Sequence, residues 1–578
     1  MVYIIADNII SPLGDDSEQT YQQMLKGHSR LKRYDNLWHL REPVVASMFD
    51  KGQRESISIE GNTFFESIVI SSIRKALASC AITLDGRTVL IISTTKGNIE
   101  HLDCNTDVSA LERYYPGKSA EKIAKDIGIT TQPIVCCNAC ISGVSAIILA
   151  MRLLNNGTYD KAIVTGAETL SEFIVSGFQS LKALSQKECR PFDMERTGLN
   201  LGEAAATMIL STTKQHDGNW EISKGAIRND ANHLSNPSKT AEGSYRAITK
   251  VLSDEDISSL SAINVHGTAT LFNDQMESIA IKRANLSSIP TNALKGYLGH
   301  TMGASGVMEA ILTMHSLDNN LLLGTRGYEE RGVSGKINIS DKVRELCNSS
   351  AFLKLISGFG GCNAALLIKK QETEQTKQDK KQTLFKPIDI EVTHRVIINN
   401  TGIIVDGINK DVNGTGKELL TNIYKSDIGD YPKFYKMDIL SRLGFIASEL
   451  LLKAEGRERF KECEDRAVAL FNSSSSICAD RAYHESIKDE DNYYPSPSAF
   501  IYTLPNIVTG EIAIRNKYYG ETVFYVLPHR DDSQINEIIN TTFMDTTIRS
   551  VIGGWIDCED DSTFEADIFI TERKQNKE

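Results

Sequence analysis

The first 370 residues alternate short runs rich in β-branched residues with helical patterns, and this alternation constrains the fold most strongly. Strands are predicted at residues 2–5, 89–93, 134–137, 162–166, 206–210, 262–265 and 365–368. Helices are predicted at residues 63–77, 141–154 and 303–317. Strands that alternate with helices build layered α/β folds, whose binding sites lie at the loops after the carboxyl ends of the strands.

The composition is that of an ordinary globular chain: 41% of the 578 residues are apolar and 24% are charged. No apolar run approaches about 18 residues, so no membrane span is expected. The net charge of −12 disfavours a nucleic acid or an anionic membrane as the main partner. The start of the chain does not resemble a signal peptide, and the eleven scattered cysteines are expected to be reduced thiols of a cytoplasmic protein.

A polar, charged stretch at residues 369–386 (KKQETEQTKQDKKQTLFK) predicts a linker. We therefore expect a complete unit at residues 1–370, with halves of about 1–212 and 213–370, then a linker at 371–392. A third half is expected at 393–572, followed by a short tail at 573–578.

The third half repeats the pattern of the first. Residues 396–405 (VIINNTGIIV) echo 3–12, residues 466–476 (RAVALFNSSSS) echo 87–97, and residues 549–557 (RSVIGGWID) echo 161–169. The offset between the two copies drifts, as small insertions would produce. This pattern predicts three related α/β halves, of which the third stands alone.

Cys140 carries the sharpest chemical signal. An apolar run ends at Cys137 and a helical pattern begins at Ser142, so Cys140 is expected at a strand-to-helix turn. The free N–H groups of a helix start favour a thiolate and can hold an oxyanion. Two alternatives stay open for this residue alone: a redox pair with Cys137, which lacks a thioredoxin-like context, and a thiol that only fills the core.

Three further elements follow in the chain. His266 ends an apolar strand and precedes Thr268 and Thr270; Lys295 and His300 flank a glycine turn; and residues 357–363 (SGFGGCN) form a glycine-rich turn. Singly, each has a structural explanation, such as a core histidine or a capped helix. The glycine-rich turn lacks the lysine and the spacing of a phosphate-binding loop, which argues against nucleotide binding.

Together and in this order, these elements resemble the β-ketoacyl-acyl carrier protein synthases of the thiolase superfamily. The resemblance covers residues 1–370 and includes 190–193 (RPFD), 202–205 (GEAA) and 229–233 (NDANH). It implies an α/β fold, namely a five-layer αβαβα ketosynthase, to which the third half adds an extra thiolase-like half domain. The departures from the family pattern, among them Gly296, Gly358 and Cys362, put the shape of the substrate in doubt rather than the reaction type.

The resemblance also implies a role for each residue. Cys140 is expected to be the acyl-accepting nucleophile, with His266 and His300 as the catalytic histidines and Lys295 as the site lysine. Glu277 is expected to be the charge partner of the lysine, and Phe359 a gate whose N–H joins that of Cys140 in an oxyanion hole. Thr268 and Thr270 are expected to contact phosphopantetheine.

The implied reaction is a decarboxylative condensation that extends an acyl chain by two carbons. A malonyl thioester loses CO2, and two neutral imidazoles stabilise the enolate that attacks the acyl group on Cys140. The order of the catalytic residues, Cys-His-His, favours elongation of carrier-bound primers. It argues against a thiolase, because the catalytic residues of thiolases resemble a Cys-His-Cys pattern. Fatty acid, polyketide, aryl polyene and other pigment pathways all stay open.

The resemblance implies an acyl carrier protein as partner and a homodimer or a ketosynthase-like second subunit. No metal motif is visible, and no cofactor is implied beyond the substrate's phosphopantetheine. The third half has no thiol where Cys140 would lie; an offset of 388 residues places Pro528 there. We therefore expect an inert half, similar to half of a chain-length factor. It only stabilises the fold, shapes the acyl tunnel, or binds the carrier or another subunit. An inert chain-length-factor-like subunit or scaffold is the alternative for the whole chain.

Overall fold

The computed structural model describes residues 1–38, 40, 42–102, 112–215, 220–255, 257–347, 349–370, 388–491 and 493–574. Most of the predicted linker, residues 371–387, and the last four residues of the predicted tail lie outside the described residues. In the described part, none of the helices is both long enough and apolar enough to span a membrane.

The first half of the complete unit contributes one mixed sheet. Its strand order is β5 (Ile134–Cys136), β4 (Thr88–Ser93), β6 (Lys161–Glu168), β8 (Ala204–Ser211) and β1 (Val2–Ile10). Helices α3 (Phe64–Ala78) and α5 (Pro116–Ile127) pack on the outer side of this sheet. Every residue of β4 is buried, as expected for a central strand that is covered on both faces.

The second half forms another sheet layer, which is joined to the first where β1 pairs antiparallel with β9 (Trp220–Asn229). It runs in the order β9, β16 (Cys362–Lys370), β15 (Ala351–Gly358), β10 (Ala262–Asn264), β11 (Pro290–Asn292) and β13 (Asn338–Ile339). Helices α8 (Glu242–Leu252) and α9 (Leu271–Arg283) lie on its outer side, and α6 (Ser142–Asn155) and α11 (Ser305–Asp318) fill the space between the two sheets. These are the five layers that the family resemblance implies, and the fold prediction is confirmed.

The C-terminal half repeats the first sheet. Its order is β21 (Thr522–Val526), β20 (Arg466–Asn472), β22 (Ser550–Cys558), β23 (Phe564–Arg573) and β17 (Ile390–Asn399), followed by β18 (Gly402–Val405) and β19 (Ile408–Lys410). Strand directions match as well, because β20 is parallel to β21 and β22 just as β4 is parallel to β5 and β6. The predicted extra half domain is therefore confirmed. Strand β17 begins within the last three residues of the predicted linker.

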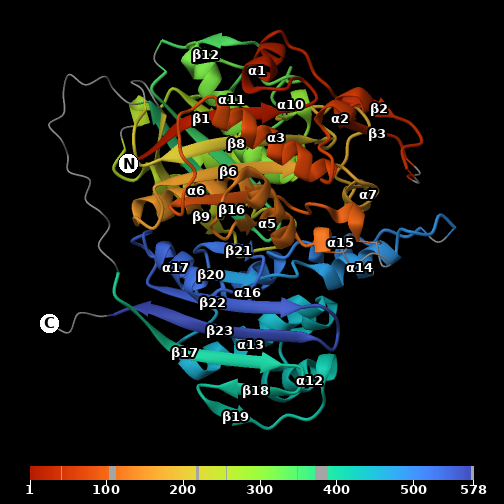
Figure 1. Cartoon of the computed structure of the whole chain (residues 1–578), viewed down its shortest axis with the longest axis vertical. Helices are drawn as coiled ribbons and strands as arrows, with labels where there is room; N and C mark the ends of the chain where they lie inside the picture. Colours follow the sequence, from red (N-terminus) through yellow and green to blue (C-terminus); the bar gives the residue numbers. More distant parts are fainter. Residues whose placement is uncertain are drawn as a thin grey trace.

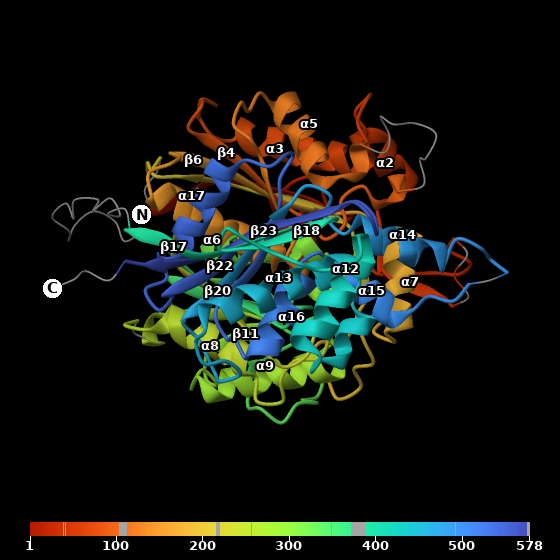
Figure 2. The ribbon, with the colours of Figure 1, turned by 90° about the horizontal axis from the view of Figure 1, so that it is seen from below.

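Helices complete the C-terminal half. They are α12 (Gly416–Ile423), α13 (Ile439–Glu455), α14 (Ile477–Glu485), α15 (Pro497–Tyr502), α16 (Ile507–Asn516) and α17 (Asp532–Thr542). Helices α12, α13 and α16 lie on one face of its sheet, and they are in front when the molecule is seen from below (Figure 2). Elsewhere in the chain are α1 (Ser17–Leu25), α2 (Lys51–Ile57), α7 (Glu172–Ser180), α10 (Lys295–Leu298) and the short strands β2 (Lys32–Tyr34), β3 (Val44–Ser47), β7 (Leu201–Gly202), β12 (Leu321–Leu322) and β14 (Arg344–Glu345).

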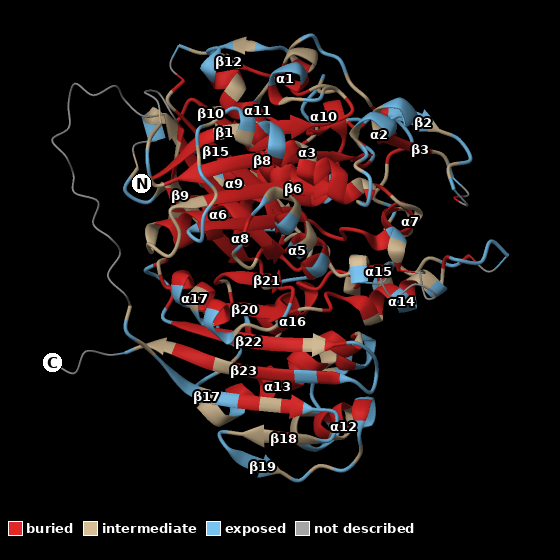
Figure 3. Cartoon of the chain, viewed as in Figure 1, coloured by how far each residue is buried: buried red, intermediate tan, exposed pale blue. Residues whose placement is uncertain are grey.

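The C-terminal half docks on the complete unit through strand pairing. Strand β21 pairs antiparallel with β5, with Tyr525 opposite Cys136, so the two sheets run on from one another (Figure 1). Red, buried strands continue across this junction, whereas the far edge is half-buried at β18 and largely exposed at β19 (Figure 3). The junction directly adjoins the segment that carries Cys140.

The strand pairing also corrects the expected position of the missing nucleophile. Ser93 of β4 pairs with Cys136, and the matching Asn472 of β20 pairs with Val526. Four residues further on, Arg530 rather than Pro528 corresponds to Cys140. Arg530 is bound to Asp532 and Asp567, and no thiol occupies this turn.

Candidate active site

Cys140 lies in a tight turn between a strand and a helix. Strand β5 ends at Cys136, a 3₁₀ turn covers Ala139–Ile141, and α6 begins at Ser142. Ala139 has a φ of +49°, in the left-handed region that non-glycine residues avoid, so the backbone is strained directly before the nucleophile. The turn is the one that the sequence predicts.

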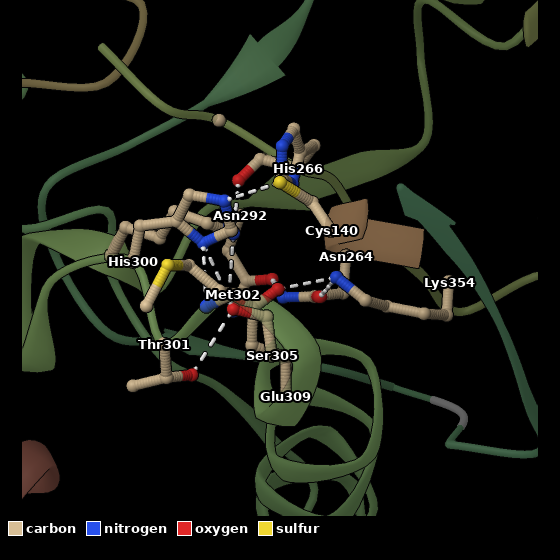
Figure 4. Close-up of polar contacts among 12 residues, drawn as sticks. Cys140, Asn264, His266, Asn292, His300, Thr301, Met302, Ser305, Glu309 and Lys354 are labelled. Atoms are coloured by element: carbon tan, nitrogen blue, oxygen red, sulfur yellow. Dashed lines mark hydrogen bonds and ion pairs between the residues drawn. The ribbon is translucent and has the colours of Figure 1, made fainter. Parts of the chain in front are cut away.

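His300 contacts the sulfur directly. Its Nε2 lies 3.0 Å from Sγ of Cys140 (Figure 4). On the other side of the ring, the backbone N–H of Met302 donates to Nδ1 across 3.2 Å. Because Nδ1 accepts this hydrogen bond, the neutral ring carries its proton on Nε2 and directs it toward the sulfur.

His266 completes the trio. Its ring centroid lies 4.9 Å from that of His300, with the planes at 81°, and one donor atom each from Cys140, His266 and His300 lies within 4.8 Å of the others. Nδ1 of His266 is buried and has no hydrogen-bond partner in the described part of the chain. The structure thus brings together the three residues that the sequence singled out.

Burial dominates the ionisation of the trio. It lowers the pKa values of His266 and His300 well below 6.5, helped by the ammonium group of Lys295. Both imidazoles are therefore neutral at pH 7, as expected. Burial also raises the pKa of the Cys140 thiol to about 12, against the opposing effect of Lys295. The expected resting thiolate is thus contradicted, because desolvation outweighs the start of helix α6.

Lys295 pairs with Glu309, and the predicted pairing with Glu277 is wrong. Nζ of Lys295 lies 2.7 Å from Oε1 of Glu309 and 2.6 Å from the backbone carbonyl of His266. The Glu277 carboxylate instead accepts the backbone N–H groups of His266 and Gly267, both at 2.7 Å. Glu277 therefore shapes the loop that presents His266, and burial raises its pKa to about 7.

Sequence reasoning missed Glu309 and Lys354. The second carboxylate oxygen of Glu309 binds Nζ of Lys354, which also lies 2.6 Å from Oδ1 of Asn264 (Figure 4). The available signal was a charge inside an apolar run: Glu309 lies in the buried helix α11, and Lys354 in the buried strand β15. Such charges are rare unless they are paired.

A cavity of about 300 Å³ leads from the surface to the sulfur. Its walls include Cys140, His266, His300, Thr268, Thr270 and Phe359. The hydroxyls of Thr268 and Thr270 lie 2.9 Å apart on this wall. The predicted site residues therefore face one space, except Lys295 and Glu277, which lie behind it.

The Gly358–Phe359 turn closes over the nucleophile. A Cβ atom at Gly358 would lie 3.1 Å from the backbone nitrogen of Cys140, so this loop sits against the nucleophile's own N–H. The Phe359 ring stacks on Phe178 with centroids 6.2 Å apart. The backbone carbonyl of Phe359 accepts a hydrogen bond from the side-chain amide of Asn506, in the C-terminal half, across 2.9 Å.

A second, narrow cavity of about 20 Å³ extends inward from Cys140. Phe178 and Phe359 line it from the complete unit, and Phe500 and Leu504 line it from the C-terminal half. The rings of Phe178 and Phe500 meet edge to face, 5.6 Å apart. The sulfur thus faces an outer channel on one side and an apolar recess, shared by both parts of the chain, on the other.

Comparison with known proteins agrees with this geometry. Residues 83–216 match the N-terminal domain of β-ketoacyl synthases, and residues 220–329 match their C-terminal domain. Over these two segments the chain is similar to β-ketoacyl synthases. The two matched segments carry Cys140, His266, Lys295 and His300.

Two of the similar proteins each match only part of this chain. The 3-oxoacyl-[acyl-carrier-protein] synthase 2 of Rhizobium meliloti (strain 1021) is 30% identical over 250 residues, which are 40% of this chain and 59% of the relative. The solved ketosynthase ApeO in complex with its chain length factor ApeC, from Xenorhabdus doucetiae, matches 64% of this chain and 98% of its own, at 25% identity and a TM-score of 0.55.

A third similarity spans both parts. The solved PfaC keto synthase-chain length factor matches 99% of this chain and 78% of its own, with a TM-score of 0.78 at 14% identity. At that identity the likeness concerns the fold. Nearly the whole of this chain, with both of its parts, therefore follows a fold that is found within one other solved protein.

Proposed function

We propose that this chain is a β-ketoacyl-acyl carrier protein synthase, which condenses an acyl group held on Cys140 with malonyl-acyl carrier protein and extends the acyl chain by two carbons. The observation that carries the proposal is the 3.0 Å contact between Cys140 Sγ and His300 Nε2, beside His266 and at the end of a channel. An inert scaffold would not need a nucleophile, two neutral imidazoles and a channel in one place.

In the first half-reaction, Cys140 Sγ attacks the carbonyl carbon of an acyl thioester. The S–C bond to the carrier's pantetheine breaks, and the thiol proton of Cys140 leaves with the released pantetheine sulfur. Because His300 already carries its proton on Nε2, this ring holds the sulfur in place rather than acting as the base. The backbone N–H groups of Cys140 and Phe359 are the proposed donors to the carbonyl oxygen.

In the second half-reaction, a malonyl thioester enters the outer channel. Its C–C bond to the carboxylate breaks, CO2 leaves, and negative charge develops on the thioester oxygen. The N–H groups of His266 and His300 stabilise this enolate in a site from which water is largely excluded. The enolate carbon attacks the acyl-Cys140 carbonyl, the C–S bond breaks, and the Cys140 sulfur leaves as a thiolate that takes up one proton from solvent.

We infer that the substrate arm is phosphopantetheine and that Thr268 and Thr270 bind it, since both residues line the outer channel and their hydroxyls lie 2.9 Å apart. The partner is then an acyl carrier protein. The site needs no metal or redox cofactor for these steps. The relatives' names support an elongating synthase of fatty acid or polyketide type, and an aryl polyene is one candidate product.

We further infer that the C-terminal half replaces the second subunit of a family dimer and forms the inner end of the acyl pocket. Phe500 and Leu504 lie in the inner cavity beside Cys140, and Asn506 holds the carbonyl of Phe359. A cavity of about 20 Å³ accommodates only a short acyl group unless these side chains move. An inert half would in this way influence which chains are accepted.

The test uses purified full-length chain with malonyl-carrier and acyl-carrier thioesters. Formation of a β-ketoacyl-carrier two carbons longer than the primer, together with CO2 release, is the expected result. The matched control is Cys140→Ala, which keeps the channel but removes the sulfur. Product formation by this variant at the rate of the parent, or no product from the parent with any carrier thioester, would rule the proposal out.

A further inference from the structure

A second buried lysine lies beside the catalytic trio and has no role in the steps above. Lys354 is in the middle of β15, and its side chain is fully buried. Strand β10 lies next to it in register, with Lys354 opposite Asn264, two residues before His266. A fully buried lysine is costly unless it is paired, so its contacts indicate what it does.

Those contacts form one connected network. Nζ of Lys354 binds Glu309 and lies 2.6 Å from Oδ1 of Asn264. The other oxygen of Glu309 lies 2.7 Å from Nζ of Lys295. Lys295 in turn holds the carbonyl oxygen of His266 across 2.6 Å. Lys354 is thus connected to the loop of His266 by two routes, one along β10 and one through Glu309 and Lys295. Figure 4 shows its contacts with Asn264 and Glu309.

The network has an excess of positive charge. Two ammonium groups, Lys295 and Lys354, share the single carboxylate of Glu309, and all three side chains are 0–1% exposed. Burial acts to raise the pKa of Glu309, but the two ammonium groups outweigh it and hold this pKa below its usual value. Burial lowers the pKa of Lys354 only to about 8, because Glu309 opposes the shift, so the cation persists at pH 7.

We propose that Lys354 is a positioning residue of the condensation step: it fixes Glu309 against Lys295 and leaves a net positive charge beside the two imidazoles, where the reaction develops an anion. This inference rests on the proposed function. In decarboxylation the negative charge moves from the malonyl carboxylate, which leaves as CO2, to the thioester oxygen beside the two imidazoles, so a cation there stabilises the enolate more than the carboxylate. In acylation the charge develops on the carbonyl oxygen, at the proposed N–H donors of Cys140 and Phe359 instead. Lys354 should therefore matter for malonyl decarboxylation and much less for acylation of Cys140.

The groups that face the imidazoles set the pH dependence. They are Lys295 from α10, Lys354 from β15, Cys140 from the nucleophile turn and, behind the His266 loop, Glu277 from α9 and Glu309 from α11. Lys354 is one of the charges that lower the pKa values of both imidazoles. Without it these pKa values rise, so activity is lost at a higher pH on the acid side.

The experiment compares Lys354→Met with the parent in two separate assays. The first follows acylation of Cys140 by intact-protein mass spectrometry, and the second follows CO2 release from malonyl-carrier between pH 5 and 9. Acylation is expected to stay within about threefold, and decarboxylation to fall by about tenfold to a hundredfold. The midpoint of the acid limb is expected to move up by about one pH unit. Lys336→Met, at an exposed loop position, is the matched control and should change neither assay.

Asn264→Asp provides a second variant if Lys354→Met does not fold. It places a carboxylate next to Lys354, so it cancels the excess charge while the lysine stays in place. The same upward movement of the acid limb is expected. If the parent performs both half-reactions while both folded variants keep its pH profile and its ratio of decarboxylation to acylation, the inference is wrong. A parent that performs neither half-reaction would instead overturn the proposed function.

Discussion

His300 lies 3.0 Å from Cys140 Sγ with its proton on the nitrogen that faces the sulfur, because the N–H of Met302 occupies the other nitrogen. A histidine held in this tautomer donates a hydrogen bond and cannot take the thiol proton. The same N–H can hold the acyl-enzyme sulfur in one step and an enolate oxygen in the next. The segment after His300, through the Met302 N–H and the Ser305 hydroxyl that contact Nδ1, therefore determines the role of its side chain.

His300→Asn should separate the two half-reactions. Asparagine does not reproduce the Nε2–H of the imidazole, so one of the two enolate donors is weakened or lost. Malonyl decarboxylation should fall by about 10²–10³, while acylation of Cys140 falls much less. A stopped acyl-transfer assay and a CO2-release assay on the same preparation provide the comparison. Equal losses in both would contradict the role of His300 in holding the enolate.

Alkylation of Cys140 should rise steeply with pH. Burial raises the pKa of this thiol to about 12, so the reactive thiolate increases about tenfold for each pH unit up to pH 10. The site-specific rate of modification by iodoacetamide, read by peptide mass spectrometry, should increase without levelling off. Glutathione in the same samples serves as an unburied reference. A plateau near or below pH 8 would show a resting thiolate instead.

The buried ion pair between Arg152 and Glu521 should hold the C-terminal half in place. Both contacts of the guanidinium with the carboxylate are 2.7 Å long, and the side chains are 4% and 0% exposed. Arg152→Met leaves Glu521 buried without a partner, so the free energy of unfolding should fall by about 3–5 kcal/mol. Chemical denaturation measures this change.

The exposed pair of Arg87 and Asp160 provides the control for that experiment. Arg87→Met should change the free energy of unfolding by about 0–1 kcal/mol, since water replaces the lost contact. The double variant Arg152→Met/Glu521→Leu should regain much of the stability lost in the single variant. Equal, small effects of the buried and exposed variants would show that the junction does not depend on this pair.

Phe500→Ala should change which acyl chains are accepted. Removing this ring enlarges the recess beside Cys140, so acylation by an octanoyl thioester should rise by about tenfold or more relative to an acetyl thioester. The exposed Tyr494→Ala, in the same half, is the control and should keep the parent's ratio. An unchanged ratio of octanoyl to acetyl acylation in a folded Phe500→Ala variant would show that the C-terminal half does not select the acyl chain through this ring.

Sequence patterns were sufficient for the layers and for the catalytic trio. The alternating strands and helices predicted the order of elements, and Cys140, His266 and His300 could be recognised because their motifs, in this order, resemble those of one family. The partner of Lys295 could not be predicted, because Glu309 reaches it from α11 only in the folded structure, while Glu277 is occupied by backbone N–H groups.

The protonation state of the Cys140 thiol could not be predicted from the neighbouring sequence either. The start of helix α6 favours a thiolate, but the Gly358–Phe359 turn and the recess shared with Phe500 and Leu504 bury the sulfur. These neighbours come from distant parts of the chain, and Leu504 lies more than 360 residues away from Cys140. Burial therefore reverses the local expectation.

The most direct measurement is the mass of the intact protein after incubation with an acyl carrier thioester and no malonyl donor. The account predicts one added acyl group, mapped to the peptide with Cys140 and absent from Cys140→Ala. It also predicts that the adduct disappears when malonyl-carrier is added, as a carrier product two carbons longer appears. An unmodified Cys140, or an adduct that malonyl-carrier does not consume, would contradict the account.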